Sequence, residues 1–287
     1  MDLNGLNTAI SKLKLLGFKV ERVESKEGFI GIGIESFPKY IERLVIPEGV
    51  EYICRTGYKI GLGINSINSS IKSIKLPSTL KRIGDSAFRA LKGLESIELP
   101  KNLNRIDQLA FSECLGLKEV KGMERLTHIG SSAFYNTGLK GDLRLSKDLV
   151  HLGYQAFSNC ENLERVDLSN CKIDKIDIGT FENCISLKEV TGISDKVTGI
   201  MAEAFMNCSY LRRVESLYSV QKIGADAFLG CISLELTLRN NNIKSIGTDS
   251  LRGIQRLKVN RCNKKKIDMC KNFGKFEGEL EWIDDEA

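Results

Sequence analysis

A hexapeptide that returns every 23 or 24 residues constrains this chain more than any other feature of its sequence. It reads Ile-Gly-Asp-Ser-Ala-Phe over residues 83–88, Ile-Asp-Gln-Leu-Ala-Phe over 106–111 and Ile-Gly-Ser-Ser-Ala-Phe over 129–134. Further copies end at Phe157, Phe181, Phe205, Phe228 and, in weaker form, Leu251. Eight copies at so regular a spacing indicate a repeat protein, in which each repeat is one short supersecondary unit.

Each repeat contains one stretch of helical spacing and one of alternating spacing. The segment Ala-Phe-x-x-Cys-x-x-Leu has apolar residues about three apart, which predicts a short helix or a single turn. The segment Leu-x-x-Ile-x-Leu, as in residues 94–99, alternates and predicts a short strand. So short a unit cannot bury its own apolar side, so the repeats must stack and share a column of Phe, Leu, Ile and Cys. The predicted fold class is therefore an α/β repeat solenoid, with short parallel strands on one side and short helices or turns on the opposite side.

The repeat also carries a family resemblance. Its pattern, I-G-x-x-A-F-x-x-C-x-x-L-x-x-V-x-L-P, resembles the BspA-type class of leucine-rich repeat. Residues 76–100 match it most plainly, with Pro77 and Pro100 at the strand exits. The resemblance covers roughly residues 44–259, about three quarters of the chain. It implies a leucine-rich-repeat coil, and its members are described as surface adhesins, host-factor binders and interaction proteins.

The chain divides into three predicted segments. Residues 44–259 form the solenoid, about eight regular repeats after an irregular first one whose extra residues we expect in a loop over 61–66. Residues 1–43 predict a helix over 6–16 and strands over 18–23 and 29–34, which we interpret as an N-terminal cap rather than a separate module. Residues 260–287 hold a basic stretch and an acidic end, which indicate a C-terminal cap and a solvated tail.

One column of the repeat is basic. It contains both histidines of the chain and predicts a stripe along one surface of the coil. The stripe could bind an acidic protein, a carboxylated glycan or a phosphate chain, but a merely solvated edge is the favoured interpretation. Its candidate residues are Arg82, Arg105, His128, His151, Lys175 and Lys222.

The outward strand positions form a second candidate binding surface. Opposite charges are expected to meet across adjacent parallel strands, which lie about 4.8 Å apart. The predicted pairs are Asp142 with Arg165, Arg165 with Glu189, Glu189 with Arg213, and Glu98 with Lys121. The candidate residues of this strand face are Glu119, Asp142, Arg144, Arg165, Asp167, Glu189 and Arg213.

Five of the nine cysteines occupy one repeat position, namely Cys114, Cys160, Cys184, Cys208 and Cys231. Leu91, Thr137 and Ile254 take the same position in other copies, which indicates a packing role rather than a redox or metal role. The spacing of metal-binding cysteine pairs is missing, and Cys262 with Cys270 makes at most a weak zinc candidate. We therefore predict no metal and no cofactor.

The sequence predicts a binding protein rather than an enzyme. It lacks a phosphate loop and an H-E-x-x-H motif, and its glycine-rich stretch over residues 28–33 lacks the helix that a dinucleotide site needs. An enzyme built on residues 1–43 has no Cys or His to use. The net charge of +5 is modest for nucleic-acid binding, and no apolar run is long enough to span a membrane.

The predicted function is a non-catalytic scaffold whose partner is another protein, and the sequence indicates no particular oligomeric state. The many unpaired cysteines and the absence of a signal-like start favour the cytoplasm. The alternative is a surface or secreted adhesin that binds host proteins or glycans.

Overall fold

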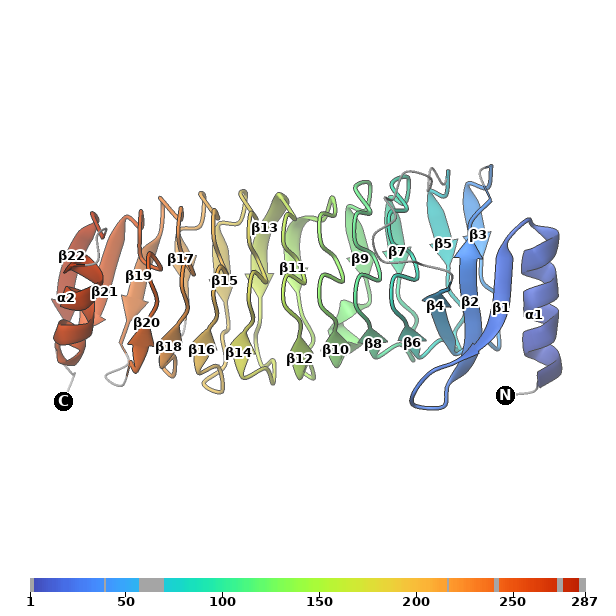
Figure 1. Cartoon of the computed structure of the whole chain (residues 1–287), viewed down its shortest axis with the longest axis horizontal. Helices are drawn as coiled ribbons and strands as arrows, with labels where there is room; N and C mark the ends of the chain where they lie inside the picture. The colour runs from blue at the N-terminus through green and yellow to red at the C-terminus, as the bar shows by residue number, and fades with distance from the viewer. Residues whose placement is uncertain are drawn as a thin grey trace. The chain divides into compact units, whose positions relative to one another are not determined.

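The computed structural model describes residues 3–38, 40–56, 70–215, 217–239, 243–272 and 276–283, with backbone only at residues 3, 4 and 269–272. The expected loop over 61–66 lies outside this range. The chain forms two compact units, Met1–Leu139 and Lys140–Ala287. Figure 1 labels the helices and strands of both.

The first unit begins with a helix and an antiparallel hairpin. Helix α1 (Leu3–Leu15) precedes strands β1 (Lys19–Glu24) and β2 (Ile30–Ser36), and β2 pairs in parallel with β4 (Tyr52–Arg55). Parallel pairing continues from β4 through β6 (Arg82–Ile83), β8 (Arg105–Ile106) and β10 (His128–Ile129). A second sheet has the order β3 (Arg43–Val45), β5 (Ser73–Lys75), β7 (Ser96–Glu98) and β9 (Glu119–Lys121), followed by a 3-10 turn at Met123–Arg125.

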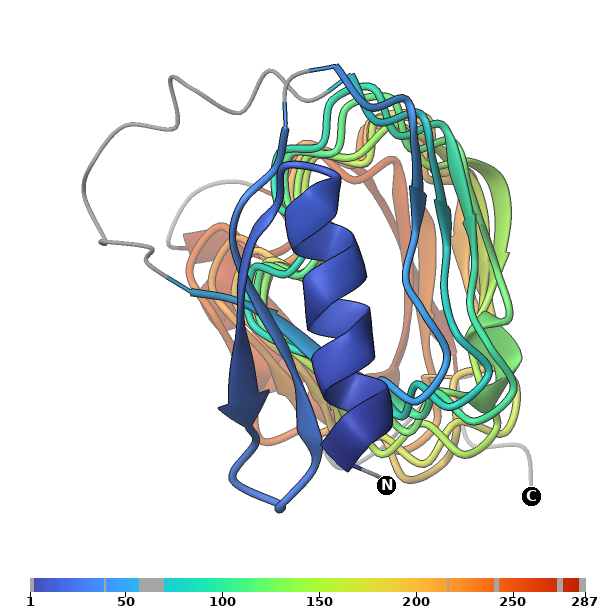
Figure 2. The same ribbon diagram turned by 90° about the vertical axis from the view of Figure 1, so that its right-hand side faces the viewer.

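Helix α1 buries one face against this unit. Leu6, Ala9 and Leu13 are at most 1% exposed, and their spacing of three and four residues places them on one side of the helix. The helix lies across the end of the unit's coil (Figure 2). It thereby covers an end at which the apolar interior would otherwise meet water, although the domain boundary at residue 43 stays a prediction.

The second unit continues the same coil design with three sheets. One has the order β11 (Lys140–Arg144), β13 (Asn162–Asp167), β15 (Glu189–Thr191) and β17 (Arg213–Val214). Another has β14 (Lys175–Ile176), β16 (Gly199–Ile200), β18 (Lys222–Ile223) and β20 (Ser245–Ile246), and β12 is His151–Leu152. The third has β19 (Glu235–Leu238), β21 (Arg256–Asn260) and β22 (Glu279–Ile283).

The C-terminal segment is more ordered than a solvated tail. Residues Arg261–Asn263 form a 3-10 turn that leads into helix α2 (Lys264–Asn272). Residues Glu279–Ile283, which the sequence suggested as part of an acidic tail, instead form strand β22 in parallel register with β21. The tail interpretation is therefore wrong for these five residues, because the parallel ladder continues beyond the last recognisable repeat.

The predicted parallel strands are confirmed, but each repeat also adds a two-residue strand that was not predicted, at the Ile of the hexapeptide.

The predicted short helices are absent from the repeats that the structure describes. Two residues before and two after each Phe, the chain adopts a left-handed conformation, as at Ser86 (φ 55°) and Ala90 (φ 60°) around Phe88. A right-handed helix requires φ near −63° throughout, so the segment forms consecutive turns.

These turns are fixed by bonds to the next turn of the coil. The amides of Ser86, Phe88 and Ala90 donate to the carbonyls of Gln108, Ala110 and Ser112 at 2.8–2.9 Å. Turns also approach closely, since a Cβ added to Gly130 would lie 2.5 Å from the backbone carbon of Asp107. Glycine in the Ile-Gly pair therefore permits the stacking distance.

Aromatic rings form the centre of both units. All seven Phe residues of the hexapeptides are fully buried, at 0% exposure. Successive rings stack, with centroids 5.3 Å apart for Phe111 and Phe134 and 5.4 Å apart for Phe205 and Phe228. Distances in this range are favourable for offset aromatic pairs.

The column cysteines pack beside these rings and bond the turns together. The thiol of Cys208 donates to the carbonyl of Phe181 at 3.0 Å, and that of Cys231 donates to Phe205 at 3.0 Å. Cys114 and Cys184 make the same bond to Phe88 and Phe157. The packing role expected from the repeat position therefore includes a hydrogen bond between adjacent turns.

We predict that Phe157→Ala lowers the free energy of unfolding by about 3–5 kcal/mol, because the ring is fully buried and stacks on Phe181 at 5.8 Å. Urea denaturation followed by circular dichroism measures the change. Tyr154→Ala is the matched control, since Tyr154 belongs to the same repeat but is 44% exposed. A loss below about 1 kcal/mol for Phe157→Ala contradicts the assigned register.

Candidate functional site

The predicted basic stripe lies on the two-residue strands. In the first unit, Arg82, Arg105 and His128 occupy adjacent positions of β6, β8 and β10. The Arg82 side chain is only 11% exposed, and its Nε donates to Oδ2 of buried Asp107 at 2.5 Å. The other carboxylate oxygen accepts from Nε of Arg105 at 2.7 Å. The expectation of an exposed stripe is therefore wrong at Arg82, whose charge is neutralised inside the unit.

Arg82 also connects the N-terminal hairpin to the coil. Its guanidinium pairs with Glu27, which lies between β1 and β2, and packs over the ring of Tyr52 at 5.5 Å. The pair with Glu27 joins residues 55 positions apart in the sequence. The role that the structure supports for Arg82 is thus attachment of the hairpin.

In the second unit, the stripe comprises His151, Lys175 and Lys222 on β12, β14 and β18. Lys175 and Lys222 both pair in register with Gly199, which separates them. The Lys175 ammonium is 45% exposed and lies 2.9 Å from Asp177. Gly199 thus interrupts the row of cations, and Asp177 compensates the charge of Lys175. Both observations favour a solvated edge, and binding through the stripe stays a prediction.

The strand face has the register that the sequence predicted. Asp142, Arg165, Glu189 and Arg213 are paired in that order across β11, β13, β15 and β17. Arg165 lies 3.5 Å from Asp142 and 4.0 Å from Glu189, and Arg213 lies 3.7 Å from Glu189. Arg144 and Asp167 form a parallel row with a 2.9 Å bond. We name these six residues the charge ladder.

Glu119, the remaining strand-face candidate, lies on β9 in the first unit. It pairs in register with Ser96, and its carboxylate is 3.7 Å from Lys121 of the same strand. Glu98 and Lys121 have the expected register. The ion pair found for Lys121, however, is the one with Glu119.

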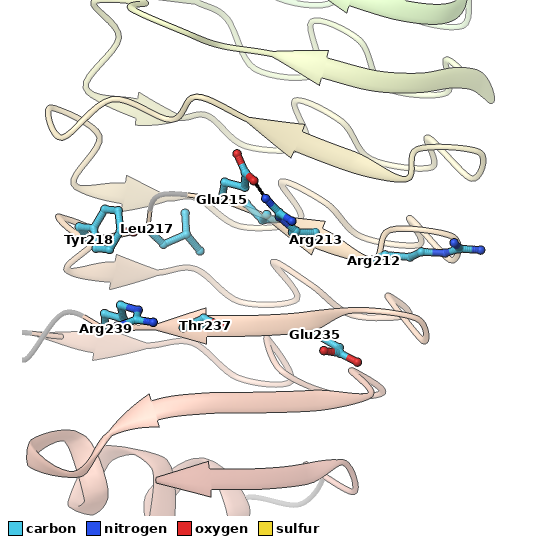
Figure 3. Close-up of a pocket in the computed structure, with 9 residues that line it drawn as sticks. Arg212, Arg213, Glu215, Leu217, Tyr218, Glu235, Thr237 and Arg239 are labelled. Atoms are coloured by element: carbon cyan, nitrogen blue, oxygen red, sulfur yellow. Dashed lines mark ion pairs between the residues drawn. The ribbon is translucent and has the colours of Figure 1, made fainter. Parts of the chain in front are cut away.

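A polar pocket of about 470 Å³ lies where the charge ladder ends (Figure 3). Arg213 and its ion-pair partner Glu215 face Glu235 and Thr237 of β19, and Arg239 directly after β19, across the pocket. Half-exposed Tyr218 and buried Leu217 line one end, and Arg212 lies at the other. The pocket therefore combines cationic, anionic and aromatic groups on one open surface.

A break in strand register produces this pocket. Val214 of β17 points into the core nine residues after Phe205, whereas in β19 the inward residues are Leu236 and Leu238, on either side of Thr237. A one-residue slip exchanges the two faces of a strand, so β17 ends one sheet and β19 begins another. Thr237 stands nine residues after Phe228, at the repeat position where Val214 and its counterparts are apolar. This substitution was the sequence signal for the pocket, and the sequence-based prediction missed it.

The first unit has a larger hollow on its own strand face, of about 1150 Å³. It runs over β5, β7 and β9 and is lined by Lys75, Glu98, Lys101, Lys121 and Arg125, among others. Both units therefore present outward charged residues on the same type of sheet.

The structure offers little chemistry beyond these surfaces. Within the described residues, no group of three or more Cys, His, Asp or Glu side chains is arranged to hold a metal ion. None of the described helices is long and apolar enough to cross a membrane. Burial raises the pKa of Cys114 and of Cys231 to about 12, which keeps both thiols protonated.

The repeated turns, paired sheets and ring column define a leucine-rich-repeat solenoid. The family model for the BspA type leucine rich repeat region matches residues 32–164 and 174–275 in six copies. The chain belongs to this family.

Solved structures of bacterial leucine-rich repeat proteins are similar in fold. The T. pallidum leucine rich repeat protein TpLRR is 21% identical, with a TM-score of 0.55, covering 92% of this chain and 96% of that one. The pneumococcal vaccine antigen PcpA is 20% identical, with a TM-score of 0.45 and coverages of 84% and 79%. A leucine rich cell surface protein from Faecalibacterium prausnitzii is 16% identical, with a TM-score of 0.38 and coverages of 93% and 94%. No curated protein matches this chain.

We predict that Asp107→Ala lowers the free energy of unfolding by about 3–5 kcal/mol, because it leaves the largely buried Arg82 without that carboxylate. Asp148→Ala serves as the control, since its pair with Lys172 is half exposed and contributes little to stability. Denaturant titration of both variants measures the difference. Equal effects would contradict the structural role of the Asp107 pair.

The column thiols should be inert in the folded protein. At pH 8, iodoacetamide should label exposed Cys262 and leave Cys114, Cys184, Cys208 and Cys231 unmodified, because the reactive thiolate form is suppressed by burial. Peptide mapping by mass spectrometry measures this. Addition of 6 M guanidinium, the control, should expose all four, and their rapid labelling without denaturant would contradict the burial.

Proposed function

We propose that this protein is a non-catalytic scaffold that binds another protein through the charge ladder and the adjoining pocket. The observation that carries the proposal is the ion-paired row Asp142–Arg165–Glu189–Arg213, which ends at the pocket between β17 and β19. Each of these side chains is outward and still partly exposed, at 31–67%.

Such a row suits recognition of a protein more than it suits catalysis. Exposed ion pairs contribute little stability, at most about 1 kcal/mol each, so their energy is not what the fold requires. They do hold long side chains in defined positions across four strands. A partner with complementary charges then meets an ordered pattern, which favours specificity and fast association.

Two ion-paired carboxylates of the second unit are poorly suited to proton transfer. The hydrogen bond and charge of Lys188 lower the pKa of Glu164, and those of Lys172 lower the pKa of Asp148. A catalytic acid at neutral pH needs a pKa raised toward 7. These carboxylates remain charged, as a recognition surface requires.

The cellular compartment is a separate part of the proposal. Because the column thiols are buried and protonated, they resist oxidation in any compartment, so the cysteine content no longer favours the cytoplasm. The cytoplasmic location and the adhesin alternative both stay predictions. Fractionation of native cells separates them, since full-length protein at the cell surface contradicts the first and protein found solely in the soluble interior contradicts the second.

Charge reversal tests the docking surface. We expect the double variant Arg165→Glu and Arg213→Glu to reduce capture of the protein's partners from native lysate by about tenfold or more, equivalent to about 1.4 kcal/mol. Quantitative mass spectrometry of proteins retained by immobilised bait measures the loss.

The matched control is Lys175→Glu with Lys222→Glu, which reverses two charges on a different sheet of the same unit. This control should capture the same proteins as the wild type. Undiminished capture by the ladder variant contradicts the proposal, and a loss confined to the control assigns binding to the basic stripe instead.

A further inference from the structure

Strand β22 leaves one edge open. It is the last strand of the sheet β19-β21-β22, and within the described residues it pairs only with β21. The amide of Glu279 donates to the carbonyl of Gln255 at 3.0 Å, toward β21. Because amides along a strand alternate in direction, those of Leu280 and Trp282 face the open edge.

Among the described residues, β22 is also the last strand beside the apolar interior. Leu280 and Trp282 pair in register with Leu257 and Val259, both of which are 0% exposed. Leu280 and Trp282 themselves are only partly buried. One further strand would cover them as β22 covers Leu257 and Val259.

The outward charges define what such a strand should carry. Arg256 lies 3.9 Å from Glu235 and 2.6 Å from Glu279, and Lys258 lies 2.8 Å from Glu281. The row Glu235–Arg256–Glu279 therefore alternates in charge, and the neighbouring row runs from Thr237 through Lys258 to Glu281. Both rows end on a glutamate, and the two glutamates are 72% and 50% exposed. In the charge ladder, an interior acid such as Glu189 contacts a cation on each side, so the next strand should be cationic at both positions.

We propose that the open edge of β22 is a docking site for an extended segment of a partner protein, aligned parallel to β22, with Lys or Arg alternating with apolar residues. Backbone bonds to the strand supply affinity, as in other cases of strand addition. The Lys or Arg side chains of the partner segment pair with Glu279 and Glu281, and its apolar side chains cover Leu280 and Trp282. This site is distinct from the charge ladder and its pocket.

A second copy of this chain is a poor occupant of the same edge. Antiparallel pairing of two β22 strands about their midpoint places Glu281 opposite Glu281. Like charges directly opposite each other are destabilising. The exposed carboxylates of Glu279 and Glu281 thus favour the binding of a cationic strand over the pairing of two β22 strands.

The single tryptophan of the chain provides the readout. The probe is a seven-residue peptide of alternating lysine and valine, blocked at both ends, added to the full-length protein. Burial of Trp282 should shift its emission to shorter wavelength in a saturable manner. The matched control is the peptide with glutamate in place of lysine, which should bind at least about tenfold more weakly.

Two variants make the test specific. Glu279→Lys with Glu281→Lys should reverse the preference between the peptides, and Glu279→Gln with Glu281→Gln, which keeps folding secure if reversal disturbs it, should abolish the preference. Glu161→Lys, which changes an exposed residue with no part in either surface, should leave it unchanged. The proposal is overturned by equal binding of both peptides, by no saturable shift with the lysine peptide, or by a dimer in sedimentation that Glu281→Lys disrupts. None of these outcomes bears on the charge ladder, which the capture experiment tests.

Discussion

The structure depends on backbone hydrogen bonds between successive turns of the coil at the Phe position. There, alternate amides donate to the next turn rather than along their own segment, as Phe205 does to Ala227 at 2.8 Å. This requires left-handed conformations at residues such as Glu203 and Asn207, each of which costs about 1–2 kcal/mol in a non-glycine residue. The burial of the stacked Phe rings and of the cysteine thiols inside the coil offsets this conformational free-energy cost.

The surfaces follow from the same geometry. Once turns are fixed at a constant spacing, each outward position becomes a row along a sheet, and residues 23 or 24 apart in sequence become neighbours. Asp142, Arg165 and Glu189 are brought together in this way. Where the spacing of inward residues slips by one at Thr237, the row ends and a pocket opens. Regular stacking thus creates the ladder, and its interruption creates the cavity beside it.

The repeat alone was enough to predict one strand of each repeat, the buried Phe column and the order of charges in the ladder, but not the two-residue strands. The helix prediction failed because apolar spacing of three also fits consecutive turns. A signal for the turns was present in Asn159, Asn183, Asn207 and Gly230, since Asn and Gly tolerate positive φ and recur two residues after the Phe. A partial signal for the burial of Arg82 was also present, because its buried partner Asp107 stands where most copies of the hexapeptide have Gly. Its second partner, Glu27, lies in a segment that does not repeat.

Amide hydrogen exchange of the native protein, resolved by residue, tests the stacked turns most directly. We expect maxima of protection at the amides of Phe88, Phe111, Phe157, Phe181 and Phe205, each bonded to the carbonyl of the next turn at 2.8–2.9 Å. Protection should therefore rise with a period of 23 or 24 residues. Rapid exchange at these five amides, with protection confined to the longer strands, would contradict stacking through these bonds.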